Sequence, residues 1–241
     1  MKLPTIETPI FSLTLPSTKE EIQFRPFLVK EQKILMMAVE SGNPKEIMTA
    51  LKKVCGHCAI TKIELNELPS FDLEYYFLNL RAKSIGEEIE LSLSHQNGST
   101  CEHVTTKKLN LLDVKIIENK EHKDNFLIDK ERNLGVKMKY PQIDSNILDD
   151  IEKKSEIEIA TEAVINCVDY IYDKDQMYKG KDYSKEDLLE FFENLTQDQF
   201  QGVASFFDTM PKLKHVVKWK CPKCGKEDEL VLEGIGNFFA F

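Results

Sequence analysis

Alternation of hydrophobic and polar residues predicts three β-hairpins along the chain. Residues 11–15 and 22–24 alternate across a polar turn, and residues 88–93 and 104–114 alternate around the turn-rich sequence HQNGSTC. A third alternating pair lies within residues 213–232. Successive side chains of a strand point to opposite faces, so this period of two is typical of half-buried antiparallel strands. We expect the second and third hairpins to share one sheet.

Hydrophobic residues at helical spacing predict two blocks of α-helix. The first block lies between the first two hairpins, and its helices cover residues 29–41, 45–54 and 71–82. The second block begins with residues 156–172, which we expect to form one continuous helix. It continues with two helices that open at the capping motifs S-x-x-D at Ser184 and T-x-x-Q at Thr196. The C-terminal segment 234–241 is expected to dock Phe238 and Phe239 as a short helix.

Segregated hairpins and helical blocks place the chain in the α+β class, with two hairpin tips forming a zinc-ribbon-like site. The pattern shows no clean boundary, so we expect a single composite domain of residues 1–241. The alternative is a division into residues 1–117 and residues 118–241. The first part would hold two hairpins and three helices, and the second a helical block with the third hairpin.

Charge and cysteine content narrow the possible functions. Asp and Glu number 41 against 32 Lys and Arg, a net charge of −9. Nucleic-acid-binding proteins normally carry a basic face, so this balance argues against nucleic acid as a partner. No apolar run reaches the roughly 20 residues that span a membrane, and the N-terminal segment lacks the apolar core of a signal peptide. In the cytosol that we therefore expect, paired cysteines are metal ligands more often than disulfides.

The strongest chemical signal is Cys221-Pro-Lys-Cys224-Gly at the predicted tip of the third hairpin. Two thiolates two residues apart, followed by a glycine that allows a tight turn, are typical of half of a tetrahedral zinc site. The alternative is an ordinary hairpin loop with two free thiols and no metal. A redox motif is disfavoured because no βαβ unit surrounds the pair.

Two upstream segments could supply the missing ligands. The favoured one is the tip of the second hairpin, where Cys101 and His103 are two residues apart and would point to one face of a strand, with His95 across the turn as a reserve. The other segment is Cys55-Gly-His-Cys58 at the end of a predicted helix. Its cysteines could equally be buried as small hydrophobic residues, and the same holds for Cys167. The favoured ligand set is Cys101, His103, Cys221 and Cys224.

Four protein ligands close a zinc site and leave no position for a catalytic water, so we expect a structural role for the metal. The sequence contains no H-E-x-x-H, phosphate-binding or nucleophile-elbow motif. We therefore predict that the chain is not an enzyme. A partner-binding surface is a further candidate at the strand-to-helix corner Phe24-Arg25-Pro26-Phe27, which could equally be a packed corner of the core.

Several longer segments resemble one family of phage proteins. They are FRPFLVKEQKILMMA, FDLEYYFLNLRAKSIGEEIEL, NLLDVKI, CVDYIYDKDQMY, YSKEDLLEFFENL, FFDTMPKLKH and GIGNFF. In this order, over nearly the whole chain, they are similar to the baseplate hub proteins of contractile-tailed phages of the T-even type. Many members of this family have polar hairpin tips without cysteines, so the metal prediction rests on the residues alone.

The resemblance implies non-enzymatic work by a late phage protein in baseplate hub assembly. Its partners would be other tail or baseplate proteins, with the tape-measure protein as one candidate, and with no nucleic acid and no membrane. It implies a location in the host cytoplasm during assembly or in the baseplate of the virion. Two alternatives stay open. One is a transient chaperone for hub or tape-measure protein that is absent from the virion, and the remote one is a zinc-ribbon nucleic-acid binder.

Overall fold

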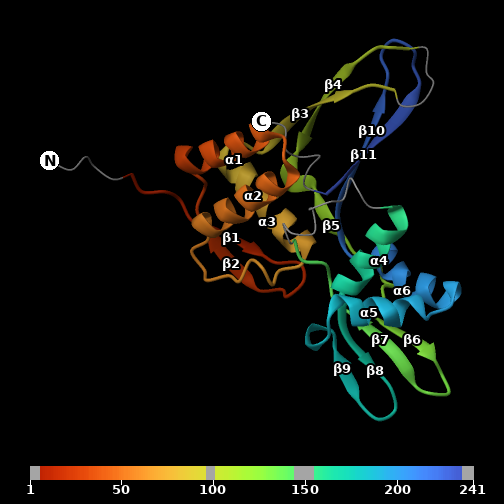
Figure 1. Cartoon of the computed structure of the whole chain (residues 1–241). Coiled ribbons are helices and arrows are strands. Elements are labelled where there is room, and N and C mark those ends of the chain that lie inside the picture. The colour runs from red at the N-terminus through yellow and green to blue at the C-terminus, as the bar shows by residue number, and fades with distance from the viewer. Residues whose placement is uncertain (1–5, 96–100, 144–154, 235–241) are drawn as a thin grey trace. The chain divides into compact units, whose positions relative to one another are not determined.

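A computed structural model describes residues 6–95, 101–143 and 155–234. These residues form six α-helices and eleven strands, with antiparallel sheets, and so confirm the α+β class (Figure 1). The chain divides into two compact units. Unit 1 combines Met1–Ile117 with Lys212–Phe241, and unit 2 is Glu118–Pro211. The last two strands therefore belong to the same unit as the first 117 residues.

Three helices form the helical part of unit 1: α1 (Val29–Ser41), α2 (Pro44–Cys58) and α3 (Ser70–Ser84). A left-handed residue, Gly42 with φ of 66°, ends α1, and the side chain of Asn43 then caps α2 ahead of Pro44. Proline at the first helical position lacks only an N–H that would have no partner there. The helices bury a common set of apolar side chains: Leu35, Leu51, Val54, Leu73, Phe77 and Leu80.

The strands of unit 1 form three separate sheets. Strand β1 (Phe11–Thr14) pairs with β2 (Glu21–Phe24), and β3 (Glu88–Leu93) pairs with β4 (Thr105–Asn110). The third sheet has the order β11-β10-β5, made by β5 (Lys115–Ile117), β10 (Lys212–Lys220) and β11 (Glu227–Glu233).

The expectation of one sheet for the second and third hairpins was therefore wrong. A 3₁₀ turn, η1 (Leu111–Asp113), interrupts the alternating segment 104–114 and redirects the backbone after β4. The short strand β5 that follows the turn takes the free edge of β10, with Ile117 opposite Lys212. With that edge occupied by β5, β3 and β4 form a two-stranded sheet of their own among the described strands.

Unit 2 is a four-stranded antiparallel sheet with three helices. The sheet order is β6 (Asn125–Asp129), β7 (Leu134–Met138), β8 (Val168–Tyr172) and β9 (Met177–Lys179). The helices are α4 (Glu156–Asn166), α5 (Lys185–Glu193) and α6 (Gln197–Thr209), with a 3₁₀ turn η3 (Gly180–Asp182) before α5. They share a core that contains Val136, Val164, Phe192, Val203 and Phe206.

The continuous helix expected over residues 156–172 was wrong in its second half. The helix ends at Asn166, the buried Cys167 follows as its C-cap, and the next five residues form β8. The sequence Val-Asp-Tyr-Ile-Tyr is rich in β-branched and aromatic residues, which suit a strand. Pairing of β8 with β7 on one side and β9 on the other decides between the two structures.

The two capping motifs were confirmed. The Ser184 side chain accepts a hydrogen bond from the backbone N–H of Asp187, and Thr196 does the same for Gln199 at the start of α6. The predicted tail helix of residues 234–241 falls almost entirely outside the described residues. Among the helices of the described ranges, none has the length and apolar character needed to cross a membrane.

Candidate metal centre

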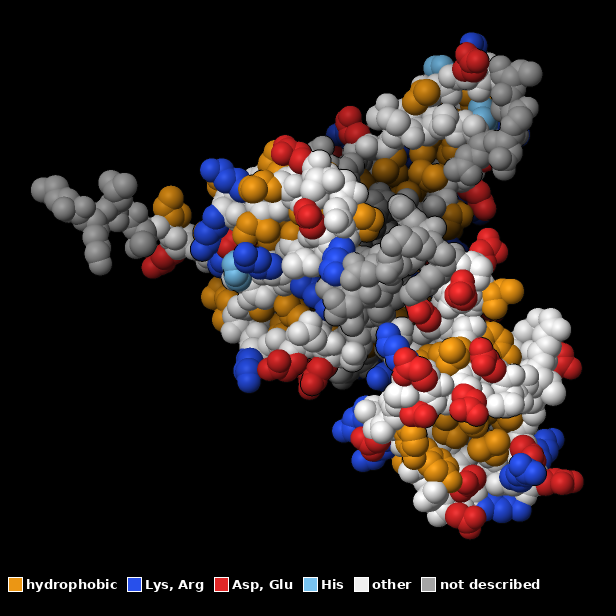
Figure 2. Space-filling view, in the orientation of Figure 1, with side chains coloured by type: hydrophobic (Ala, Val, Ile, Leu, Met, Phe, Trp, Pro, Cys, Tyr) orange, Lys and Arg blue, Asp and Glu red, His pale blue; other side chains and the backbone are white. Residues whose placement is uncertain are grey.

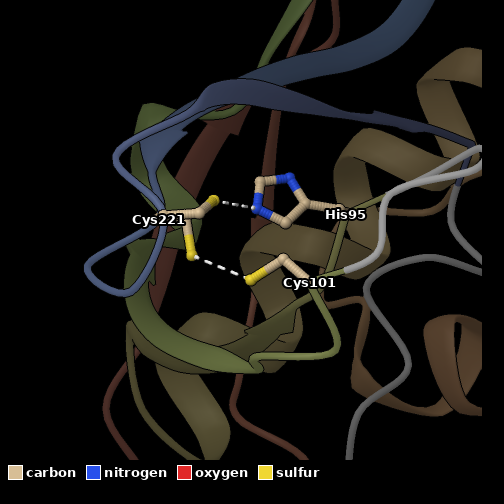
Figure 3. A group of neighbouring side chains, drawn as sticks. His95, Cys101 and Cys221 are labelled. Carbon is tan, nitrogen blue, oxygen red and sulfur yellow. Dashed lines mark hydrogen bonds between the residues drawn. The ribbon is translucent and has the colours of Figure 1, made fainter.

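Four sulfur and nitrogen ligands from two hairpins of unit 1 come together at one point. His95 and Cys101 lie in the connection between β3 and β4, and Cys221 and Cys224 lie in the turn between β10 and β11. The candidate ligand atoms of these four residues are all within 4.8 Å of one another. Figure 3 shows His95 and Cys101 facing Cys221, with the imidazole and the thiols converging. The predicted meeting of the two hairpin tips therefore occurs in the structure.

The turn between β10 and β11 is closed by its own backbone. The N–H of Gly225 donates to the carbonyl of Cys221 at 2.9 Å, and the N–H of Cys221 donates to the carbonyl of Lys226 at 2.9 Å. Gly225 has φ of 75°, a left-handed conformation that glycine adopts without strain. This short turn keeps the two cysteines side by side and directs backbone N–H groups towards the Cys221 sulfur.

Backbone N–H groups and neighbouring charges act differently on the two thiols. Hydrogen bonding from the Cys224 backbone, helped by His95 and the backbone of Lys223, lowers the pKa of Cys221 to about 6 in spite of desolvation. For Cys224, the Lys226 backbone lowers the pKa, but burial and the adjoining thiols of Cys221 and Cys101 outweigh it and the pKa is raised. A thiolate at Cys221 is the form that a metal binds.

The imidazole of His95 is held between a carboxylate and an aromatic ring. Its Nδ1 lies 3.0 Å from Oδ2 of Asp228, and its side chain has no exposed surface. The ring lies 4.9 Å, centroid to centroid, from the indole of Trp219. The hydrogen bond to Asp228 raises the pKa of His95, and the same bond lowers the pKa of Asp228. With Nδ1 engaged, Nε2 is the nitrogen that faces the cluster, 3.2 Å from the Cys224 sulfur.

These distances fit a tetrahedral zinc ion. With Zn–S bonds of about 2.3 Å, sulfur ligands of a tetrahedral zinc lie about 3.8 Å apart. The Cys101 and Cys221 sulfurs are separated by 3.9 Å. All six cysteines are among the described residues and none forms a disulfide, so the three thiols of the cluster are available as ligands. One imidazole and three thiols also match the donor set that zinc prefers in structural sites.

The other predicted ligands do not join the cluster. His103 is half-buried and stands outside the group of four, so that the reserve ligand His95 takes the position that the sequence favoured for His103. Cys55 and Cys58 are fully buried at the end of α2. Burial raises the pKa of Cys55 and raises that of Cys58 to about 11, which keeps both as neutral thiols.

The corner Phe24-Arg25-Pro26-Phe27 packs inside unit 1. The side chains of Phe24 and Phe27 are buried, and the Arg25 guanidinium donates to the carbonyls of Pro26 and His57 at 2.9 and 3.0 Å. It also pairs with the buried carboxylate of Glu31 at 3.1 Å. These contacts agree with the packed-corner alternative, since the side chains of Phe24, Arg25 and Phe27 are used within the chain.

Asp228 and Trp219 are two residues of the site that the sequence analysis did not identify. They are directly opposite each other in the β10–β11 ladder. A signal for them was present, because Trp219 and Cys221 are two residues apart and therefore share a face of the strand. If the residues of the two strands are paired outward from the tight turn, Asp228 falls opposite Trp219.

Comparison with known proteins gives the family. Residues 8–240 match the family described as T4 bacteriophage base plate protein, and the chain belongs to this family. It is 24% identical over 222 residues to the baseplate hub assembly protein gp26 of Enterobacteria phage T4, which covers 90% of this chain and 92% of the relative. No solved structure matches the chain.

Proposed function

We propose that this chain takes part in assembly of the baseplate hub of a contractile phage tail, through protein–protein contacts and without catalysis. The observation that carries the proposal is the similarity to a hub assembly protein along nearly the full length of both chains. The partners would be other tail or baseplate proteins, and the work would begin in the host cytoplasm. Retention in the finished baseplate is favoured over transient action as a chaperone for hub or tape-measure protein.

The proposal includes a structural zinc ion held by His95, Cys101, Cys221 and Cys224. Four protein ligands complete a tetrahedron, so that no coordination position is left for a reacting water. The ion would tie the tip of the β3–β4 hairpin to the tip of the β10–β11 hairpin, which pair in separate sheets. Its contribution would be to the rigidity of unit 1 and to the surface that these two tips present.

A complementation experiment tests the assembly role. A phage that lacks this gene is grown in cells that supply the full chain from a plasmid, and tails are counted by electron microscopy. We expect baseplates and tails to form only when the chain is supplied. Normal tails without the chain would refute the role in assembly. Mass spectrometry of purified virions then separates a retained component, present at a fixed copy number, from a transient chaperone.

We predict about one zinc ion per chain in protein purified without chelators, because the two half-sites make one tetrahedral centre. Elemental analysis by mass spectrometry, normalised to protein concentration, measures this ratio. Protein that carries no metal and takes up none from added zinc would refute the site.

A second metal prediction concerns Asp228, which positions His95 without touching the ion. Asp228→Ala should weaken zinc affinity about 10- to 100-fold, because partners that hold a histidine ligand typically contribute this much. Competition with a chromophoric chelator measures the affinity. The matched control is Glu227→Ala, one residue earlier on β11, because Glu227 makes no hydrogen bond with His95 in the described part of the chain. Equal loss in both variants would show that Asp228 has no positioning role.

A further inference from the structure

The negative charge of the protein is concentrated in unit 2. Residues 118–211 contain 22 Asp and Glu side chains and 12 Lys and Arg side chains. The remaining residues contain 19 acidic and 20 basic side chains, so that unit 1 is close to neutral. A strongly negative surface attracts cationic segments and raises their association rate. Unit 2 is therefore the part of the chain whose charge suits it to bind such a segment.

A groove between α4 and α5 has an apolar floor. Its volume is about 480 Å³, and its apolar residues are Ile157, Ile165 and Leu189. Ile157 is 78% exposed and Leu189 is 37% exposed, whereas Ile165 is buried beneath them. Figure 2 shows hydrophobic side chains bordered by acidic ones over these two helices. Single exposed apolar residues are ordinary, but here two of them line one groove.

The rim of the same groove is acidic. It carries Glu158, Glu162, Glu186 and Glu193 against a single lysine, Lys185. The carboxylates of Glu186 and Glu193 make no hydrogen bond or ion pair with any residue in the described ranges. An apolar floor between negative edges is complementary to a helix with an apolar stripe flanked by cations.

We propose that this groove docks a basic amphipathic α-helix of another protein. Leucine- or isoleucine-like side chains on one face of that helix would cover Ile157 and Leu189. Its Lys or Arg side chains would face Glu186 and Glu193. At about 1.5 Å per residue, the 11 residues of α4 offer a track for roughly three turns of a docked helix. The inference rests on the proposed function only in taking another protein as the occupant.

A second hollow on unit 2, about 470 Å³ in volume, is lined by Asp173, Tyr178 and Asp187 among others. Two of its three acidic residues, Asp173 and Asp187, already have partners within the chain. Asp173 accepts hydrogen bonds from two backbone N–H groups and from the Tyr178 hydroxyl, and Asp187 belongs to the capping box of α5. The α4–α5 groove is therefore the better site for an external cation.

The test uses the full chain and a synthetic probe, a fluorescent helical peptide of leucine and lysine with leucines at i, i+3, i+4 and i+7. Fluorescence anisotropy should detect binding of this peptide. A peptide with glutamate in place of lysine should bind at least about tenfold more weakly because its charges are repelled by the rim. Absence of binding by the lysine peptide, or equal binding of both, would overturn the proposal.

Two variants then locate the bound peptide. Ile157→Ala with Leu189→Ala removes the apolar contacts without changing charge, and Glu186→Lys with Glu193→Lys reverses the rim. Each should weaken peptide binding at least about fivefold. The matched control, Glu131→Lys with Asp208→Lys, makes the same change of charge on unit 2 outside the groove. A loss with this control as large as that in the rim variant would show diffuse attraction and overturn the site.

Other occupants give different outcomes. Sedimentation that detects a dimer, broken by the Ile157 and Leu189 variant, would assign the groove to a second copy of this chain and overturn docking of a foreign helix. Peptide binding that appears only after alanine replaces Ile147, Leu148 and Ile151 would assign the groove to the chain's own preceding segment, with the same consequence.

Complementation separates this inference from the proposed function. If the wild-type chain fails to restore tails, the assembly role fails and the peptide results are unaffected. If the wild-type chain restores tails and the groove variants do so equally well, docking in the groove is overturned while the assembly role stands. Restoration by the wild type and the control, but not by the groove variants, supports both.

Discussion

Replacing both Cys221 and Cys224 by serine is expected to abolish zinc binding and to lower the melting temperature of unit 1 by about 10 °C. A ligand that binds only the folded state stabilises it by about 4 kcal/mol at a concentration 1,000 times its dissociation constant. For a unit of this size each kcal/mol changes the melting temperature by a few degrees. Metal analysis and thermal unfolding followed by circular dichroism measure the two effects. The helices of unit 1 should still fold, because Leu35, Leu73 and Phe77 pack without the metal.

Three controls identify the ligands. His95→Ala should lose zinc and His103→Ala should retain it, because only His95 lies in the cluster. Replacement of Cys55 and Cys58 should leave the metal content unchanged, since both thiols are buried at the end of α2. Zinc that is lost from the Cys55 and Cys58 variant, but kept when His95 and Cys101 are changed, would assign the metal to the other C-x-x-C pair.

Replacing Glu31 by glutamine should lower the free energy of unfolding by about 3 kcal/mol, the loss typical when a buried ion pair is broken on one side. The Glu31 side chain has no exposed surface. Its carboxylate accepts hydrogen bonds from Arg25 at 3.1 Å and from the backbone N–H of Leu28 at 2.9 Å. Chemical denaturation followed by tryptophan fluorescence and circular dichroism measures the change. Glu40→Gln, at an exposed position of the same helix, should change stability by less than about 0.5 kcal/mol.

The buried carboxylate of Glu31 also predicts that the free energy of unfolding depends on pH. Burial acts to raise the pKa of Glu31, but the hydrogen bonds from Arg25 and Leu28 outweigh burial, and the folded-state pKa is lowered. The stabilisation is therefore present above the ordinary glutamate pKa and is lost as the pH falls through the folded value. The wild type and Glu31→Gln should converge in stability under acid conditions. A constant difference from neutral to strongly acid pH would contradict this role of the carboxylate.

Local signals in the sequence predicted elements that depend on local contacts. Ser184 and Thr196 mark the starts of α5 and α6 because capping needs only the next three residues. Residues 168–172 were misread because the helical spacing of residues 156–166 continues into them, and only pairing with β7 and β9 makes them a strand. The separate sheets of unit 1 likewise depend on pairing between distant segments, such as that of β5 with β10.

The two hairpin tips that form the candidate site were predictable from the sequence, but the histidine ligand was not. Cys221 and Cys224 are recognisable from spacing, and Cys101 from its position at the other hairpin tip. His103 was favoured on the assumption that residues 101 and 103 lie on one face of a strand. Strand β4 begins only at Thr105, so that this two-residue alternation does not apply to them. His95 is placed instead by Asp228 on the other hairpin, a contact that spacing along the chain cannot reveal.

The pairing of β5 with β10 has a consequence for the order of events during synthesis. Ile117 and Lys212 face each other in that ladder, so the 94 residues of unit 2 leave and re-enter unit 1 at adjacent points. The ribosome must therefore complete unit 2 before β10 emerges, and unit 2 can fold while unit 1 still lacks its last two strands, β10 and β11. The candidate ligands Cys221 and Cys224 are made about 120 residues after Cys101. A chain that binds metal at this centre has consequently been translated at least as far as Cys224, and a chain that terminates before that residue cannot complete the site.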